Sequence, residues 1–238
     1  MKKIVYSAIA AATLIIAACT PKTTETTAES TIKFNADGKL KIAQLTDTHL
    51  SWTEPEEFEK TYSQLCSVLD TEKPDLVVFN GDQLSDSFPN ASLRNIDAAL
   101  NALLSPLDRR GIPFLFSYGN HDCEKDAVIS RAQQAALYYK HSSCYAAMDG
   151  YDSGTYNVTV SRSDGKGAAL NIYIMDTGIW NGSGTMGGVT AQQVEWYRAK
   201  SDELKASNGG VILPSLLFQH MPVKETYKLL TPAKPGAK

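Results

Sequence analysis

Short apolar runs and longer amphipathic stretches alternate along most of this chain. Runs of strand length, some continuous and some alternating with polar residues, occupy positions 40–45, 76–79, 113–117, 154–160, 168–175 and 211–218. Between them, apolar residues recur every three or four positions, which is the spacing of one helical face, near 53–69, 92–110, 125–140 and 190–206. Three strand–helix pairs, two adjacent strands and a final helix–strand pair predict an α/β fold of two packed sheets covered by helices.

Local residue choices indicate where several of these elements begin and end. The stretch 76–79 has no polar interruption, as expected for a strand that is buried on both faces. The segment 163–167, Ser-Asp-Gly-Lys-Gly, predicts a hairpin between two strands. Thr190 and Gln193 have the spacing of a capping box, which predicts the start of a helix. Pro106 is expected to kink or end the last turn of its helix, because proline lacks the N–H that a helix interior needs.

Composition indicates a single domain without a nucleic-acid-binding surface. The 238 residues are 43% hydrophobic and 21% charged, which is ordinary for a globular domain and enough for one sizeable core. The formal net charge of −3 argues against the basic face that binding to nucleic acid requires. We therefore expect one domain over residues 32–238.

The N-terminus has the features of an export signal. Lys2 and Lys3 precede an apolar stretch, 4–18, that is too short to span a bilayer as a helix, and small residues then precede Cys19. This pattern resembles a bacterial lipobox and predicts a lipoprotein signal peptide over 1–18 and membrane attachment through lipid on Cys19. An ordinary secretory signal that contains a cysteine is the alternative. Residues 19–31, rich in Thr, predict a flexible tether, and the expected location is the outer membrane or the periplasmic face.

Four short motifs, each directly after a predicted strand, carry most of the candidate chemistry. They are Asp47-Thr48-His49, Gly81-Asp82, Gly119-Asn120-His121-Asp122 and Gln219-His220. Because open α/β sheets bind ligands beyond the carboxyl ends of their strands, we expect these side chains to share one rim. A mixture of carboxylate, imidazole and carboxamide donors suits Fe, Mn or Zn better than a calcium or thiolate site.

In these residues the chain resembles the calcineurin-like metallophosphoesterase superfamily, whose pattern is D-x-H, G-D, G-N-H-[DE], a lone His and then G-H-x-H. The resemblance covers roughly residues 39–238, and His220-Met221-Pro222 followed by Glu225 is similar to the purple-acid-phosphatase-like branch. It implies a sandwich of two mixed β-sheets flanked by helices. It also implies hydrolysis of phosphomonoesters or phosphodiesters by a water that two divalent or trivalent metal ions activate.

The resemblance assigns a ligand role to five residues. Asp47 and His49 would bind the first metal. Asp82 would bridge both metals, since a carboxylate has two oxygens, and Asn120 and His220 would bind the second. Taken singly, each of these residues is more often part of a turn, a cap or a loop with ordinary hydrogen bonds.

Histidines and acids near these motifs have more than one interpretation. His121 is the candidate general acid, because an imidazole carries a transferable proton near neutral pH. Asp122 is the second candidate catalytic residue, orienting His121 through a carboxylate–imidazole hydrogen bond, or else it caps the following helix. His141 lies outside the motifs, and we expect a surface-loop residue there rather than a substitute ligand.

One family motif is absent from this sequence. No G-H-x-H follows His220, so the chain resembles a family member that is incomplete at its C-terminus. Each metal would then keep three protein ligands, which together with waters can hold a catalytic ion. The alternative function is a catalytically silent, truncated or degenerate phosphoesterase-like lipoprotein.

The remaining candidates carry weaker signals. Cys123 could pair with Cys144, although the sequence does not settle the connectivity, and Cys66 lies on an apolar helical face. Trp52 and Trp180 lie in predicted loops that could line the site. The segment 176–178, Asp-Thr-Gly, ends another strand and resembles an architectural stretch of the family.

Overall fold

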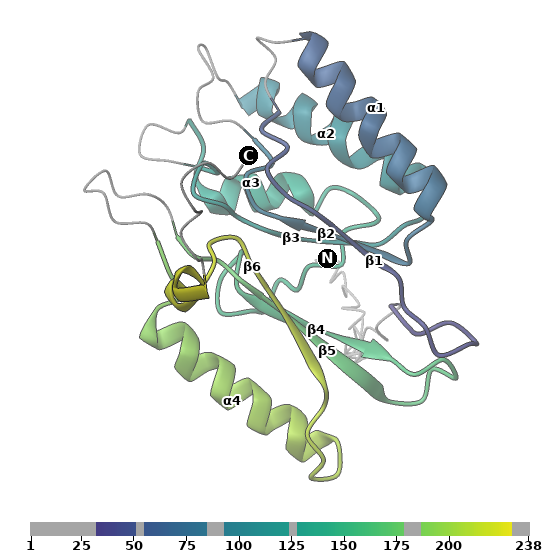
Figure 1. Ribbon diagram of the computed structural model, residues 1–238, viewed down its shortest axis with the longest axis vertical. Coiled ribbons are helices and arrows are strands. Elements are labelled where there is room, and N and C mark those ends of the chain that lie inside the picture. The colour runs from purple at the N-terminus through teal and green to yellow at the C-terminus, as the bar shows by residue number, and fades with distance from the viewer. Residues whose placement is uncertain (1–31, 51–54, 85–92, 124–127, 179–186, 230–238) are drawn as a thin grey trace, which may run out of the picture.

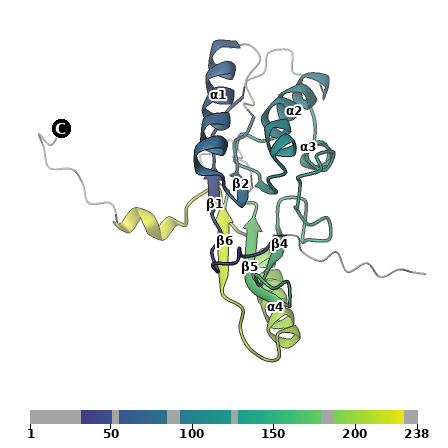
Figure 2. The same cartoon turned by 90° about the vertical axis from the view of Figure 1, so that its right-hand side faces the viewer.

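A computed structural model describes residues 32–50, 55–84, 93–123, 128–178 and 187–229. Two three-stranded sheets pack face to face, and helices lie on the outer side of each, which gives four layers (Figure 1). Figure 2 shows the same layers after a turn of 90°, with α1, α2 and α3 above the sheets and α4 below them. The two-sheet α/β sandwich expected from the order of elements is confirmed.

The first sheet contains three parallel strands. They are β1 (Ile42–Leu45), β2 (Leu76–Asn80) and β3 (Phe114–Ser117), in the order β1-β2-β3. Every residue of β2 and β3 is buried, as the uninterrupted apolar run at 76–79 predicts for a strand covered on both faces. Because the strands are parallel, their carboxyl ends and the loops that follow them meet at one edge.

Helices α1 (Pro55–Glu72) and α2 (Leu93–Arg110) cover the outer face of this sheet, and α3 (Arg131–Tyr138) lies beside β3 (Figure 1). The inward face of α2 is apolar and buried, including Leu100, Leu103, Leu104 and Leu107. Burial of such a stripe, rather than intrinsic helix propensity, supplies most of the stability of a helix in a protein.

The second sheet is mixed. Strand β4 (Tyr156–Ser161) pairs antiparallel with β5 (Ala168–Met175), which pairs in parallel with β6 (Ser215–Gln219). Helix α4 (Ala191–Ser207) covers its outer face, where Tyr173 packs against Trp196 and Tyr197. A short 3-10 helix, η1 (Lys224–Leu229), follows β6. The predicted hairpin and the Thr190–Gln193 capping box are both present.

One tyrosine joins the two sheets through the edge of β3. The Tyr156 hydroxyl donates to the Phe116 carbonyl at 2.7 Å and accepts from the Phe116 N–H at 2.9 Å. The Phe114 carbonyl and N–H are satisfied by the neighbouring segment, through Tyr145 and Ser143. Backbone groups on this edge are therefore paired, as buried peptide groups must be.

Two element boundaries differ from the sequence-based expectations, whereas the end of α2 is confirmed. Helix α2 continues to Arg110 as expected, with Pro106 buried inside it, so the proline does not end the helix. Helix α3 begins at Arg131 rather than near 125, because Ser130 and Gln133 form a capping box there. Strand β6 begins at Ser215, four residues after the predicted apolar run starts, and Val211 and Ile212 are exposed.

Several expectations fall on residues outside the described ranges. These are the signal peptide and Cys19, the tether at 19–31, and the loop residues Trp52 and Trp180. Among the helices that the structure describes, none combines the length and apolarity that crossing a membrane requires.

The apolar face of α2 gives a test of the fold. Leu100 is 0% exposed, so Leu100→Ala should lower the free energy of unfolding by about 2–5 kcal/mol through lost burial and a residual cavity. Leu93 is 50% exposed on the same helix, and Leu93→Ala is the matched control, with a change within about 0.5 kcal/mol. Urea denaturation of both variants measures the difference, and equal losses would contradict the assigned inward face.

Candidate metal centre

The four sequence motifs meet at the carboxyl ends of β1, β2, β3 and β6. The loop after β1 is held against the loop after β2 by backbone hydrogen bonds from Asp47 to Gly81 and from His49 to Asp82, each 3.0 Å. Asp47, His49 and Asp82 all have positive φ, at 56°, 41° and 54°. Non-glycine residues rarely adopt this conformation, and such strain concentrates at functional sites.

A first donor set lies on the exposed side of the site. The His49 Nε2 atom is 3.8 Å from Asp47 Oδ1 and 3.6 Å from Asp82 Oδ2. The side chains of Asp47 and His49 are 52% and 40% exposed, so solvent reaches this set. The expected grouping of Asp47, His49 and Asp82 is thus present as a cluster of two carboxylates and one imidazole.

A second donor set lies deeper and spans both sheets. The His220 Nε2 atom is 3.2 Å from Asp82 Oδ2 and 3.2 Å from Asn120 Oδ1. The other ring nitrogen, Nδ1, donates to the Asn80 carbonyl at 2.9 Å, which leaves Nε2 to face the two oxygens. A carbonyl partner on one imidazole nitrogen is the usual support for a metal-binding histidine.

Asp82 is common to both sets. Its Oδ2 atom faces His49 and His220, whereas its Oδ1 accepts the His121 backbone N–H at 2.8 Å. A single oxygen, rather than the two that the sequence suggested, thus faces both sets. Burial alone would raise the pKa of Asp82, but the hydrogen bonds from His220 and His121 outweigh it, and the pKa is lowered. Asp82 is therefore an anion although its side chain is buried.

The same contact raises the pKa of His220. Burial alone would lower this pKa, but the hydrogen bonds to Asp82 and to the Asn80 carbonyl outweigh burial. His220 Nε2 faces Asp82 Oδ2 and Asn120 Oδ1, and all three atoms present lone pairs when the imidazole is neutral. A positive charge between them is needed to make these contacts favourable. A proton supplies that charge at pH values below the raised pKa, and a metal cation is the alternative.

The donor chemistry fits metal ions. Ligand atoms of Asp47, Asp82 and His220 all lie within 4.8 Å of one another, which one cation can bridge. Three carboxylate or amide oxygens and two imidazole nitrogens match the preferences of Fe, Mn and Zn.

Glycines allow the loops to approach this closely. Gly81 has φ 95°, and a Cβ there would lie 2.6 Å from His220 Nδ1. A Cβ at Gly119 would overlap the Asp82 carboxylate and backbone. Both glycines of the motifs are therefore required by sterics, since any side chain would push apart the donors of the second set.

Asp122 links the loop that follows β2 to the loop that follows β3. It is fully buried and accepts from the N–H groups of Asp82 at 2.7 Å, Gly119 at 2.9 Å and Leu84 at 3.4 Å. Gln134 Nε2 donates to it at 3.2 Å. Burial raises the pKa of Asp122 and the charge of Asp82 adds to this, while the Gly119 and Gln134 donors act in the opposite direction.

One of the two interpretations of Asp122 is wrong, because Ser130 caps the following helix. Orientation of the His121 ring by Asp122 stays a prediction. The contacts of Asp122, which is fully buried, make it a support of the loops that carry Asp82 and Asn120. His121 lies at the site, with its ring centroid 5.2 Å from that of His49.

Other residues singled out in the sequence lie elsewhere. His141 is not a surface-loop residue: its side chain is 8% exposed and its Nδ1 is 2.7 Å from Asp108 Oδ2. It packs on Phe114, at the opposite end of β3 from the candidate metal ligands. Cys66, Cys123 and Cys144 are free thiols, so the Cys123–Cys144 pair does not form. The pKa of both Cys123 and Cys144 is raised to about 12 by burial.

Sequence reasoning missed the residues that hold the second sheet to the first. Asn80 Nδ2 donates to the backbone carbonyl of Gln219 at 2.9 Å, and the backbone carbonyl of Asn80 accepts from His220 Nδ1. Arg131 pairs with Asp176 and also donates to the Gly119 carbonyl at 3.0 Å. The position of Asn80 just before the Gly-Asp motif was the only available signal for it, and Arg131 lies in no motif.

The chain is similar to several curated proteins whose names refer to phosphatases, some of them as probable inactive ones. "Probable inactive purple acid phosphatase 14" of Arabidopsis thaliana is 25% identical over 229 residues, which cover 82% of this chain and 56% of that protein. "Phosphatase DCR2" of Saccharomyces cerevisiae is 27% identical over 225 residues, which cover 85% of this chain and 38% of that protein. The chain thus spans about half, or less, of the length of these curated relatives.

Structural and family comparisons agree with the motifs. A crystal structure of a dimetal phosphatase from Danio rerio has the same fold, with a TM-score of 0.53 and 15% identity over 78% of this chain and 71% of that one. The sequence profile of the family described as calcineurin-like phosphoesterase matches residues 40–233, which include all four motifs. The chain therefore belongs to the calcineurin-like phosphoesterase family.

Proposed function

We propose that this protein hydrolyses phosphomonoesters or phosphodiesters with two metal ions bound around Asp82. The observation that carries the proposal is the convergence of two donor sets on Asp82 Oδ2, which is 3.6 Å from His49 Nε2 and 3.2 Å from His220 Nε2. Shared carboxylates of this kind are typical of two-metal sites for phosphoryl transfer.

Each residue has a role that follows from its position. Asp47, His49 and Asp82 would hold one ion on the exposed side, where a substrate can enter. Asp82, Asn120 and His220 would hold the other. Two such ions, when bound, neutralise phosphoryl oxygens and lower the pKa of an attacking water.

His121 would protonate the leaving oxygen as the phosphorus–oxygen bond breaks. Its ring lies beside that of His49, at the open side of the site. Its backbone N–H donates to Asp82 Oδ1 at 2.8 Å, and this contact remains when the side chain is replaced. A positioned acid of this type contributes to the rate only when the leaving group needs a proton.

Catalytic silence is the second candidate function. Relatives from Arabidopsis thaliana carry the words "probable inactive" in their names. A silent protein would keep the fold and some metal affinity but would lack turnover. The metal content and the activity of the wild type separate the two functions.

Membrane attachment through Cys19 is part of the proposal. The lipobox-like sequence before this cysteine supports it. Cys19→Ala should move the protein from the membrane fraction to the soluble exported fraction or leave it unprocessed, as cell fractionation and immunoblotting would detect. Unchanged membrane association and processing would contradict lipid attachment.

Removal of the shared carboxylate tests the metal centre. Asp82→Asn should abolish phosphatase activity and remove both ions, because an amide lacks the charge that two cations share. Asp97→Asn is the matched control, since Asp97, near the start of α2, forms an exposed ion pair with Lys140. Elemental analysis of purified proteins measures the ions. Equal metal content in wild type and Asp82→Asn, or none in either, would overturn the proposal.

Substitution of His121 tests the proton donor. His121→Ala should keep the metal content of the wild type and lose turnover of alkyl phosphates by roughly 10²–10⁴-fold. The loss should be smaller for aryl phosphates, whose leaving groups need little protonation. A loss of bound metal would make His121 a ligand instead. A metal-loaded wild type without activity on either ester class would favour catalytic silence.

A further inference from the structure

We propose that Arg131 is a positioning residue that sets the geometry of the second metal site by clamping the Gly119–Asn120 peptide to the second sheet. This inference rests on the proposed function, because it assigns Arg131 a selective effect on one of the two sites. Arg131 is the first residue of α3 and touches none of the candidate ligands' side chains.

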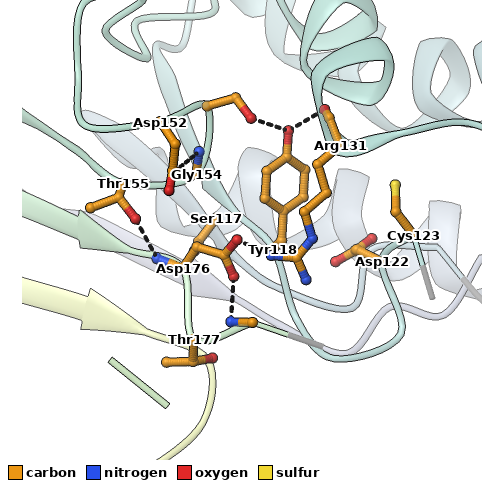
Figure 3. Close-up of polar contacts among 12 residues, drawn as sticks. Ser117, Tyr118, Asp122, Cys123, Arg131, Asp152, Gly154, Thr155, Asp176 and Thr177 are labelled. Atoms are coloured by element: carbon orange, nitrogen blue, oxygen red, sulfur yellow. Dashed lines mark hydrogen bonds and ion pairs between the residues drawn. The ribbon is translucent and has the colours of Figure 1, made fainter. Parts of the chain in front are cut away.

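The Arg131 guanidinium contacts Asp176, Gly119 and Tyr118, and Figure 3 shows it between Asp176 and the Tyr118 ring. Nη1 forms an ion pair with Asp176 Oδ2, and Nη2 donates to the Gly119 carbonyl at 3.0 Å. The group also lies over the Tyr118 ring, 4.9 Å from its centroid. Both partners of the ion pair are largely buried, with side chains 19% and 12% exposed, so the contact is little screened by solvent.

The contact with Gly119 bears directly on Asn120. The Gly119 carbonyl belongs to the peptide bond whose nitrogen is that of Asn120. The Gly119 N–H is held by Asp122 at 2.9 Å, so the peptides on both sides of this residue are fixed. The orientation of the Gly119–Asn120 peptide in turn places the Asn120 side chain, whose Oδ1 is 3.2 Å from His220 Nε2.

Asp176 connects this clamp to the sheet that carries His220. It follows β5, whose Met175 pairs with Gln219 of β6, the residue before His220. The Asp176 carboxylate accepts the Gly178 N–H at 2.7 Å, and the Asp176 carbonyl accepts from Gln193 at 2.8 Å. Asp176 is thus fixed in the second sheet, as the bonds drawn around it in Figure 3 show.

The two donor sets depend on this clamp to different degrees. Asp47, His49 and Asp82 all follow strands of the first sheet and are joined by their own backbone hydrogen bonds. The second set takes Asp82 and Asn120 from the first sheet and His220 from the second. Loss of Arg131 should therefore weaken the second site and spare the first.

The experiment is a Mn²⁺ titration of four variants by calorimetry. Arg131→Met should raise the dissociation constant of the second site by about 10- to 100-fold, the usual effect of removing a supporting contact behind a ligand. Asn120→Ala identifies which binding step belongs to that site. Arg110→Met is the matched control, since Arg110 forms a two-fold ion pair with Asp70 on the surface. Arg131→Lys, which keeps the charge, should recover part of the affinity.

Arg131→Met leaves the buried Asp176 carboxylate without its ion-pair partner, and the double variant R131M/D176N removes that unpaired charge. If the unpaired charge alone weakens the second site, the double variant will bind Mn²⁺ as tightly as the wild type. That result would overturn the inference. Continued weakness of the second site supports the clamp. Binding by Arg131→Met equal to that of the wild type would also overturn it and leave the dimetal function standing.

Amide hydrogen exchange of the metal-free protein gives an independent readout. The N–H groups of Gly119 and His121 should exchange faster in Arg131→Met than in the wild type, while those of α1 should not change. If the wild type binds no Mn²⁺, the proposed function and the role of Arg131 at a metal site both fail. Equal exchange at Gly119 and His121 would then also exclude a role for Arg131 in holding this loop.

Discussion

A buried carboxylate, Asp122, must be satisfied by N–H groups from two different loops, and the site depends on this constraint. Taking a carboxyl group out of water is costly unless donors replace the lost hydration. Here the donors are the backbone N–H groups of Asp82, Leu84 and Gly119 and the Gln134 amide. The bonds from Asp82 and Gly119 fix the peptides at Asp82 and next to Asn120, so satisfying the buried carboxylate of Asp122 also positions two candidate ligands.

The second constraint is the meeting of the two sheets. Tyr156 pairs with the backbone of Phe116, Asn80 with Gln219 and His220, and Arg131 with Asp176. All of these contacts are polar and lie between apolar layers, where an unpaired partner is expensive. They therefore specify one arrangement of the sheets, whereas apolar packing alone would tolerate several. Donors that come from different sheets are brought together only when that arrangement forms.

The sequence predicts the local parts of this molecule well. Strands, helices and the Thr190–Gln193 capping box follow from periodicity and cap chemistry, which act over a few residues. The motifs predict which side chains gather, because parallel strands share a carboxyl edge. The sheet pairing confirms that edge, and His220 lies within hydrogen-bonding distance of both Asp82 and Asn120 there.

Contacts between distant segments are what the sequence does not predict. Arg131 and Asp176 are 45 residues apart, and nothing in the local pattern of either indicates the other. Asp122 was expected to orient the His121 imidazole or to cap a helix, but two of its donors, the N–H groups of Asp82 and Leu84, come from a loop about 40 positions earlier. His141 was expected in a surface loop because its neighbours are polar, and its pairing with Asp108 depends on tertiary packing.

The unequal exposure of the two donor sets has a kinetic consequence. Asp47 and His49 are open to solvent, whereas Asp82 and His220 are 3% and 7% exposed. An ion in the inner set would leave slowly, since water must first reach its ligands, while an ion in the outer set would equilibrate quickly with the surrounding medium. The identity of the metal in the inner set would then be fixed by the metal available during folding. The metal in the outer set would exchange with the ions of the buffer.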